Sequence, residues 1–118
     1  MYTPVESKEK GWFKIPGYPY FYANRKGELM NVKTGYVTKG SLDDKGYRRA
    51  CIWDNENEKK KDVKVHHLIC TAFYGKCPSG HEAGHKNDVR DDNRASNLGW
   101  ITRGDNMTKA NKKRSLKW

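Results

Sequence analysis

Turn-forming residues break the first third of the chain into short apolar and aromatic runs. The runs occupy residues 12–15, 18–22 and 29–32, and the Pro, Gly, Asn and Thr residues between them favour turns. This punctuation is typical of short antiparallel strands. The chain is therefore predicted to begin with a meander of such strands.

A longer hairpin and a short helix are predicted next. Residues 46–53 and 62–66 are the expected arms of the hairpin, and the charged segment 54–61 is its expected exposed and mobile loop. Residues 67–74 read HLICTAFY, which places apolar side chains on one face of a helix. Gly75 stands where a helix of this length is expected to end.

The last third alternates a polar loop with two short elements. Residues 86–97 are rich in Asn and Asp, which hydrogen-bond to nearby backbone, so we expect a structured loop. Residues 98–101 are predicted as a short strand. Thr102 and Asp105 resemble a capping box, which predicts a helix from there to about Lys112.

The charge of the chain points to a polyanionic partner. The 118 residues carry 24 Lys and Arg against 14 Asp and Glu, a net charge of +10. Nucleic acid is the simplest partner for such a surface, although ribosomal, membrane-surface and chaperone-like proteins are also basic. We expect DNA contacts from six residues, of which any one could instead belong to a solvated face: Arg94, Arg103, Lys109, Lys112, Lys113 and Arg114.

Length and apolar content exclude two classes of protein at this stage. A chain of 118 residues suits one domain with one modest core. No apolar run approaches the roughly 20 residues that span a bilayer, and no apolar segment follows the charged start as in a signal peptide. Together with three cysteines, an odd number, this favours free thiols and an intracellular, cytoplasmic location.

Two side chains could carry hydrolytic chemistry. A strand, loop, strand and helix in succession would bring His85 and Asn106 face to face. A neutral imidazole can take a proton from water while an amide oxygen holds a divalent cation against a phosphate. The alternatives are a structural histidine and a helix-capping asparagine.

The order of motif residues from Val65 to Asn106 resembles the HNH endonucleases of phages and mobile introns, which belong to the His-Me finger (ββα-metal) superfamily. The residues that carry this resemblance are Val65-His66-His67-Leu68-Ile69, Ala72-Phe73, Pro78, Gly80, His85, Asp92-Asn93-Arg94, Asn97-Leu98, Trp100-Ile101-Thr102 and Asp105-Asn106. Upstream, residues 12–35 look like the small DNA-binding element that often precedes this domain.

The resemblance implies an α+β fold, with N-terminal short antiparallel strands followed by a ββα-metal finger and a basic C-terminal helix. We expect a single domain over residues 1–118. Within it, residues 11–61 would form a strand-rich DNA-binding region, residues 62–112 the nuclease finger and residues 113–118 a basic tail.

The resemblance also implies roles for four polar residues. His85 matches the general base that activates water, and Asn106 matches the asparagine that ligates one divalent ion, Mg²⁺ or Mn²⁺. Asn97 matches the middle asparagine of the motif, which supports catalysis by tying the loop together and so aiming His85. His66 matches a histidine that we interpret as a packing and hydrogen-bonding residue. The implied activity is hydrolysis of double-stranded DNA, and we expect a monomer that nicks.

One position departs from the family pattern. Intron-encoded members often carry Asp directly before the catalytic histidine as a second metal ligand, whereas this chain has Gly84. We expect weak metal affinity as a result, and we do not expect Asn87 or Asp88 to replace the missing oxygen. A glycine here could also mark backbone angles that only glycine tolerates.

Two alternative functions remain open on the sequence. The first is a DNA-binding module that has lost catalysis, which Gly84 favours and the pair His85 and Asn106 disfavours. The second is a structural zinc site built from four residues of suitable type: Cys70, Cys77, His81 and His85. Their spacing lacks the close C-x-x-C pair that such sites usually contain.

Overall fold

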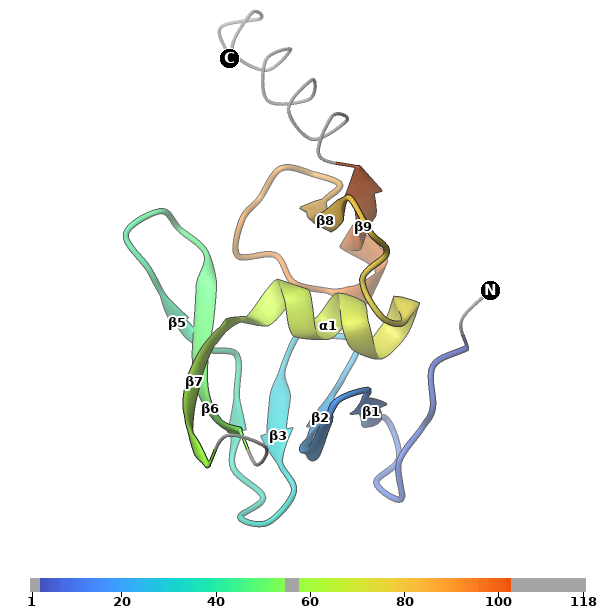
Figure 1. Cartoon of the computed structure of the whole chain (residues 1–118), viewed down its shortest axis with the longest axis vertical. Helices are drawn as coiled ribbons and strands as arrows, with labels where there is room; N and C mark the ends of the chain where they lie inside the picture. Colours follow the sequence, from blue (N-terminus) through green and yellow to red (C-terminus); the bar gives the residue numbers. More distant parts are fainter. Residues whose placement is uncertain (1–2, 55–57, 103–118) are drawn as a thin grey trace, which may run out of the picture.

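The computed structural model describes residues 3–54 and 58–102. Within them the fold is α+β, and one helix lies between three small antiparallel sheets (Figure 1). The predicted C-terminal helix and basic tail lie outside the described residues, as do Arg103, Asn106 and the four basic residues from Lys109 to Arg114.

The N-terminal sheet confirms the predicted meander. Its strands run in the order β1 (Phe13–Ile15), β2 (Tyr18–Ala23), β3 (Leu29–Asn31) and β4 (Val37–Thr38), each antiparallel to the next. Alternate residues of these strands point inward, so Phe13, Ile15, Phe21, Ala23 and Leu29 are buried.

The second sheet contains the predicted hairpin, with different boundaries. It is formed by β5 (Ser41–Leu42), β6 (Arg48–Asp54) and β7 (Lys59–Lys64). Residues 59–61, expected in the loop, are paired with β6, because this register keeps Ile52 and Val63 on the buried face. The predicted mobility of the loop centre, residues 55–57, lies outside the described residues.

Helix α1 (Val65–Tyr74) begins two residues earlier than predicted. Val65 and His66 were expected to end the hairpin arm, but the buried apolar stripe of the helix already starts at Val65 and continues with Leu68, Ile69 and Ala72. Its end is as predicted, because Gly75 adopts a φ of 85° and its N–H bonds to the carbonyl of Thr71.

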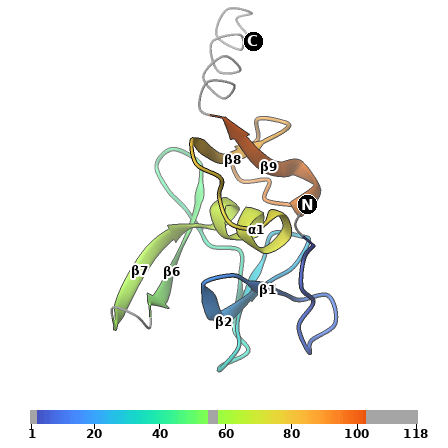
Figure 2. The same ribbon diagram turned by 45° about the vertical axis from the view of Figure 1, so that its right-hand side comes forward.

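The helix organises one continuous core. Both views place α1 between the N-terminal strands and the last hairpin, with β6 and β7 beside it (Figures 1 and 2). Leu29, Leu68 and Leu98 are each fully buried, although they come from three separate elements. Burying a side chain of this size contributes roughly 1.5–3 kcal/mol, so each element depends on the others for stability.

The last sheet is the hairpin of β8 (His81–His85) and β9 (Leu98–Thr102). The connection over residues 86–97 is a structured loop, as predicted, and ends in the 3-10 turn η1 (Ala95–Asn97). Tyr74 donates a hydrogen bond to the carbonyl of Ala95, and this bond fixes η1 to the end of α1. Among the described residues, no helix is long and apolar enough to cross a membrane.

Candidate active site

His85 is the last residue of β8 and lies directly before the polar loop. Its side chain is buried, with 8% of its surface exposed, and Nε2 lies 2.8 Å from Oδ1 of Asn93. A carbonyl oxygen only accepts, so in this arrangement Nε2 carries the proton. The lone pair that could accept a proton from water is then on Nδ1.

Asn97 joins the two ends of the loop that follows His85. Its side-chain nitrogen donates to the side-chain oxygen of Asn87 and to the carbonyl of Asp92, both at 2.9 Å. Its side-chain oxygen accepts from the backbone N–H of Asn87 at 3.1 Å, and its backbone carbonyl accepts from Lys86 at 2.7 Å. These bonds hold the backbone immediately after His85 in one place.

Two further rings pack beside His85. The ring of His66 lies 4.8 Å from that of His85, measured between centroids, and Tyr47 stacks on His66 at 5.3 Å. Tyr47 is 6.2 Å from His85. Burial lowers the pKa of His66 to about 3, and the neighbouring His85 and Lys64 act in the same direction. His66 is therefore neutral at physiological pH.

His66 differs in part from the predicted packing and hydrogen-bonding residue. It is buried and packed between aromatic neighbours, as a packing role requires. Its Nδ1 is buried without a hydrogen-bond partner in the part of the chain that the structure describes. The adjacent His67, to which we gave no role, lies with its ring edge against Trp100 at 5.2 Å.

The N-terminal sheet reaches the site through its β2–β3 turn. The carbonyl of Arg25 accepts a hydrogen bond of 2.9 Å from the N–H of Ala95. Gly27, at a φ of 93°, packs so closely on Asn93 that an added Cβ would lie 2.5 Å from its carbonyl oxygen. The residue that holds His85 is therefore itself supported by the N-terminal region.

Gly84 does not have the backbone conformation that we considered for it. Its φ is outside the left-handed region, so the expectation of glycine-only angles is wrong. Its side-chain direction is blocked instead, because an added Cβ would lie 2.4 Å from Cδ1 of Ile101 and 2.9 Å from Cγ1. The strand pairing of Gly84 with Gly99 places Ile101 beside it on β9.

The described residues contain no cluster of three or more His, Cys, Asp or Glu side chains that could hold a metal ion. The residues of the zinc alternative are engaged elsewhere. Cys70 is buried in α1, where burial raises its pKa to about 12, and the Cys77 thiol lies 3.2 Å from the carbonyl oxygen of His81. All three cysteines are free.

Arg94 is the one predicted DNA contact within the described residues, and it is already paired. Its Nε and Nη2 donate to the two carboxylate oxygens of Asp92, each at 2.8 Å. These bonds hold the pKa of Asp92 well below its usual range. Part of the positive charge of Arg94 is therefore neutralised within the protein.

Sequence reasoning missed two residues of the site. Asn93 belongs to the quoted motif but received no role, although its position eight residues after His85 in an Asn-rich loop was a usable signal. Tyr47 comes from the turn before β6, far from His85 in sequence, and no local pattern connects the two. Only the packing of the β5–β6 turn against α1 and the loop brings them together.

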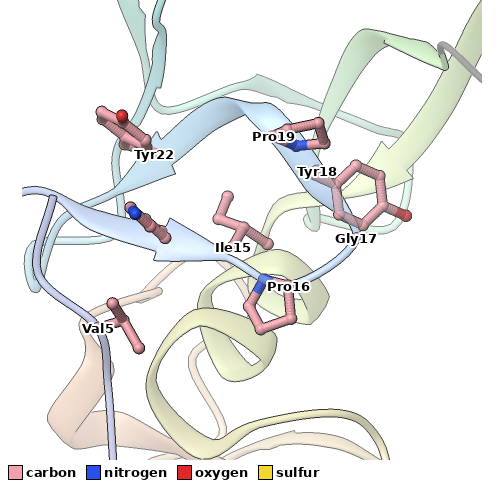
Figure 3. A pocket seen from close by; sticks show the side chains of 8 residues that line it. Val5, Ile15, Pro16, Gly17, Tyr18, Pro19 and Tyr22 are labelled. Carbon is pink, nitrogen blue, oxygen red and sulfur yellow. The ribbon is translucent and has the colours of Figure 1, made fainter.

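A separate hollow of about 410 Å³ lies at the β1–β2 turn (Figure 3). Its lining is mainly apolar and aromatic, including Ile15, Pro16, Tyr18 and Tyr22. No histidine, cysteine or carboxylate is among its lining residues. The chemistry-bearing residues gather instead around His85.

Comparisons with known proteins give matches among HNH endonucleases. Residues 63–108 match the model of a family described as HNH endonuclease. The chain is 29% identical over 97 residues to the DNA endonuclease I-HmuI of Bacillus phage SP01, a match that covers 81% of this chain and 55% of that protein. It is 30% identical over 89 residues to an uncharacterised HNH endonuclease of Acanthamoeba polyphaga mimivirus, covering 75% of this chain and 26% of the other.

A solved structure, of DNA binding and cleavage by the HNH homing endonuclease I-HmuI, has the same fold. Its TM-score is 0.74 at 27% sequence identity, and the match covers 90% of this chain and 59% of that one. The chain thus spans little more than half the length of the phage protein.

Proposed function

We propose that this chain is a metal-dependent DNA endonuclease that hydrolyses phosphodiester bonds, because residues 63–108 place it in the HNH endonuclease family. The single observation that carries the proposal is the environment of His85 within that segment. The imidazole is anchored at Nε2 by Asn93, and His85 ends strand β8, after which Asn97 holds the backbone by hydrogen bonds. A base that is held in this way can act on a water molecule in one defined direction.

The reaction that these residues support is an in-line displacement at phosphorus. Nδ1 of His85 takes a proton from water, and the water oxygen forms a bond to the phosphorus. The bond between the phosphorus and the 3′-oxygen breaks, and that oxygen leaves with the electron pair and takes a proton from solvent water. The products are a 5′-phosphate and a 3′-hydroxyl. Asn97 and Asn93 act as positioning residues in this scheme, because they bond to the loop and to the imidazole.

HNH endonucleases generally use a divalent metal, and Asn106 is the residue that we propose holds it. The described residues do not form a ligand cluster on their own, and Gly84 offers no side chain. An ion held by one amide oxygen, water and phosphate oxygens suits Mg²⁺ or Mn²⁺, which keep several waters. When bound there, such an ion would neutralise charge on the phosphate and on the departing oxygen.

A specific observation favours a second candidate, a DNA-binding module without catalysis. The position before His85 carries no ligand, and the side chain of Ile101 fills the space where one would begin. The basic charge of the chain would serve such a module equally well. Retention of a buried, anchored His85 is the reason that we place cleavage first.

Incubation of a supercoiled plasmid with the full chain and Mg²⁺ or Mn²⁺ separates the two candidates. We expect open circles that form only with metal and that DNA ligase can reseal, because ligase requires a 5′-phosphate beside a 3′-hydroxyl. A monomer with one site should accumulate nicked circles before any linear product. Retarded but intact plasmid with both metals would instead support the binding module. We also propose that the protein is located inside cells, because its three cysteines are free thiols. This location is compatible with both candidate functions.

A further inference from the structure

Most of the described arginines around the candidate site are already paired with acids. Arg48 lies 3.9 Å from Asp91, Arg49 lies 2.8 Å from Asp62, and Arg94 forms its two bonds with Asp92. Their charges are partly compensated, so they attract a phosphate less strongly than unpaired cations do.

Two cations near His85 differ from this group. Nζ of Lys64 lies 5.0 Å and Cζ of Arg90 5.1 Å from the centroid of the same ring, that of Tyr47. Both side chains are exposed, and neither forms an ion pair within residues 3–54 and 58–102. Arg90 is also anchored, because its Nη1 donates to the carbonyl of Lys45 at 2.7 Å, and its remaining N–H groups stay available as donors.

Tyr47 connects these two charges to the candidate base. Its ring is 5.3 Å from His66 and 6.2 Å from His85, so both cations lie over a ring that packs beside the candidate base. The contacts come from three segments: Lys64 is the last residue of β7, directly before α1, Arg90 lies in the loop after β8, and Tyr47 lies just before β6. The ring holds both cations in place before any ligand arrives.

We infer that Lys64 and Arg90, positioned by Tyr47, form a binding site for the backbone phosphates that flank the scissile one. This inference rests on the proposed function and assigns it a substrate-orienting site. A DNA strand carries a phosphate at every nucleotide, so a phosphate at His85 has a neighbour on either side, and cations held on a ring that packs beside His85 are suited to contact these neighbours. Two fixed cations there would align the strand with the base as well as add affinity.

The test compares the variants Lys64→Ala and Arg90→Ala with Lys8→Ala. Lys8 is the control, because it is an exposed lysine that lies outside the expected DNA-binding region, residues 11–61, and outside the expected nuclease finger, residues 62–112. Single-turnover cleavage of a duplex carrying a mapped nicking site is measured with enzyme in excess at saturation, alongside binding by fluorescence anisotropy at several salt concentrations.

We expect Lys64→Ala and Arg90→Ala each to slow cleavage at saturation about tenfold or more and to reduce the log–log salt slope of binding by about 0.9, one phosphate contact. Lys8→Ala should leave the saturated rate within about twofold of wild type. Tyr47→Phe, which keeps the ring, should resemble wild type, whereas Tyr47→Leu should resemble the loss of both cations. Equal saturated rates for Lys64→Ala, Arg90→Ala and Lys8→Ala would overturn the inference.

A second measurement combines the same variants with a change in the charge of the DNA. A neutral methylphosphonate placed on either side of the nicking site removes the phosphate charge from the DNA instead of from the protein. In wild type, a methylphosphonate at either position should slow cleavage. In Lys64→Ala or Arg90→Ala, the methylphosphonate at the phosphate that the missing cation would contact should not slow cleavage further. Full additivity at both positions would contradict the inference. If wild type cleaves no DNA, the proposed function fails. If wild type cleaves DNA and Lys64→Ala and Arg90→Ala cleave at the same rate as the control variant, the inference fails and the proposed function stands.

Discussion

The side-chain oxygen of Asn93 lies 2.8 Å from Nε2 of His85, and both side chains are buried. This contact fixes the ring orientation and the tautomer of the imidazole, because the amide oxygen can only accept. It also connects the N-terminal sheet to the site, since Gly27 packs against the backbone of Asn93. The strand-rich region therefore supports the candidate base in addition to any contact it makes with DNA.

Asn93→Asp should change the pH profile of cleavage without removing the contact. A carboxylate at hydrogen-bond distance favours the protonated imidazole and raises its pKa, so activity should begin to rise at higher pH than in wild type. At matched alkaline pH the two proteins should cleave at similar rates. Single-turnover rates across the pH range check this, and an unchanged profile would mean that Asn93 does not contact the base during catalysis.

Gly27→Ala should destabilise the fold more than Gly11→Ala. Both glycines have left-handed φ angles, 93° and 85°, so both substitutions carry a conformational cost of about 1–2 kcal/mol. Only Gly27 faces a neighbour, the Asn93 backbone at 2.5 Å, whereas no atom lies within 4 Å of the Cβ position at Gly11. Urea unfolding should show a further loss of about 1–3 kcal/mol for Gly27→Ala, as for other overpacked sites. Equal losses would show that the backbones do not meet.

His66 should make the protein less stable as the pH falls. Its pKa is about 3 in the folded chain and 6.5 when exposed, so between these values the unfolded chain binds a proton that the folded chain does not. The free energy of unfolding should therefore fall with decreasing pH by up to about 1.4 kcal/mol per pH unit from this group. His67, whose pKa burial also lowers, acts in the same direction.

The variant His66→Phe isolates this contribution, because phenylalanine keeps a ring in the stack and cannot be protonated. Urea unfolding at pH values of about 4.5 and 6.5 should show a smaller pH dependence in the variant, whatever its absolute stability. The carboxylates, including Asp92, titrate in both proteins and cancel in the comparison. An identical slope in the two proteins would mean that His66 is not held neutral by the fold.

Sequence patterns predicted those parts of this molecule that depend on local spacing. The apolar stripe of α1, the stop at Gly75 and the Asn-rich loop after His85 were all predicted, because each depends on residues within a few positions of one another. The boundary between β7 and α1 was wrong by two residues, since Val65 suits either element until the core that it enters is known.

The remaining parts of the site depend on contacts between distant segments. Tyr47 reaches His66 and His85 only because the turn before β6 folds over the start of α1. The crowding at Gly84 depends on a side chain across the β8–β9 pair, and nothing within β8 indicates that Ile101 fills that space. Arg25 and its hydrogen-bond partner Ala95 belong to segments that no periodicity connects.

Gly84→Asp should lower the metal requirement of cleavage only when Ile101 is also shortened. The single variant should be destabilised, because its Cβ would meet Ile101 at 2.4 Å, whereas Gly84→Asp combined with Ile101→Ala removes the obstructing atoms. A carboxylate oxygen there suits Mg²⁺ and Mn²⁺. Metal titrations of cleavage at alkaline pH, with Ile101→Ala as control, test this. A folded double variant that needs as much Mg²⁺ as the control would place the ion away from residue 84.

The most direct test of the central claim is cleavage of one duplex by wild type and His85→Ala, with binding of both measured by anisotropy. Wild type should cleave faster as the pH rises through the range where an imidazole loses its proton, near 6.5 for an ordinary histidine. His85→Ala should bind the duplex within about twofold of wild-type affinity, since the imidazole acts on water, and should cleave at least about a hundredfold more slowly. Substantial cleavage by His85→Ala over the same pH range would contradict the assignment of His85 as the general base.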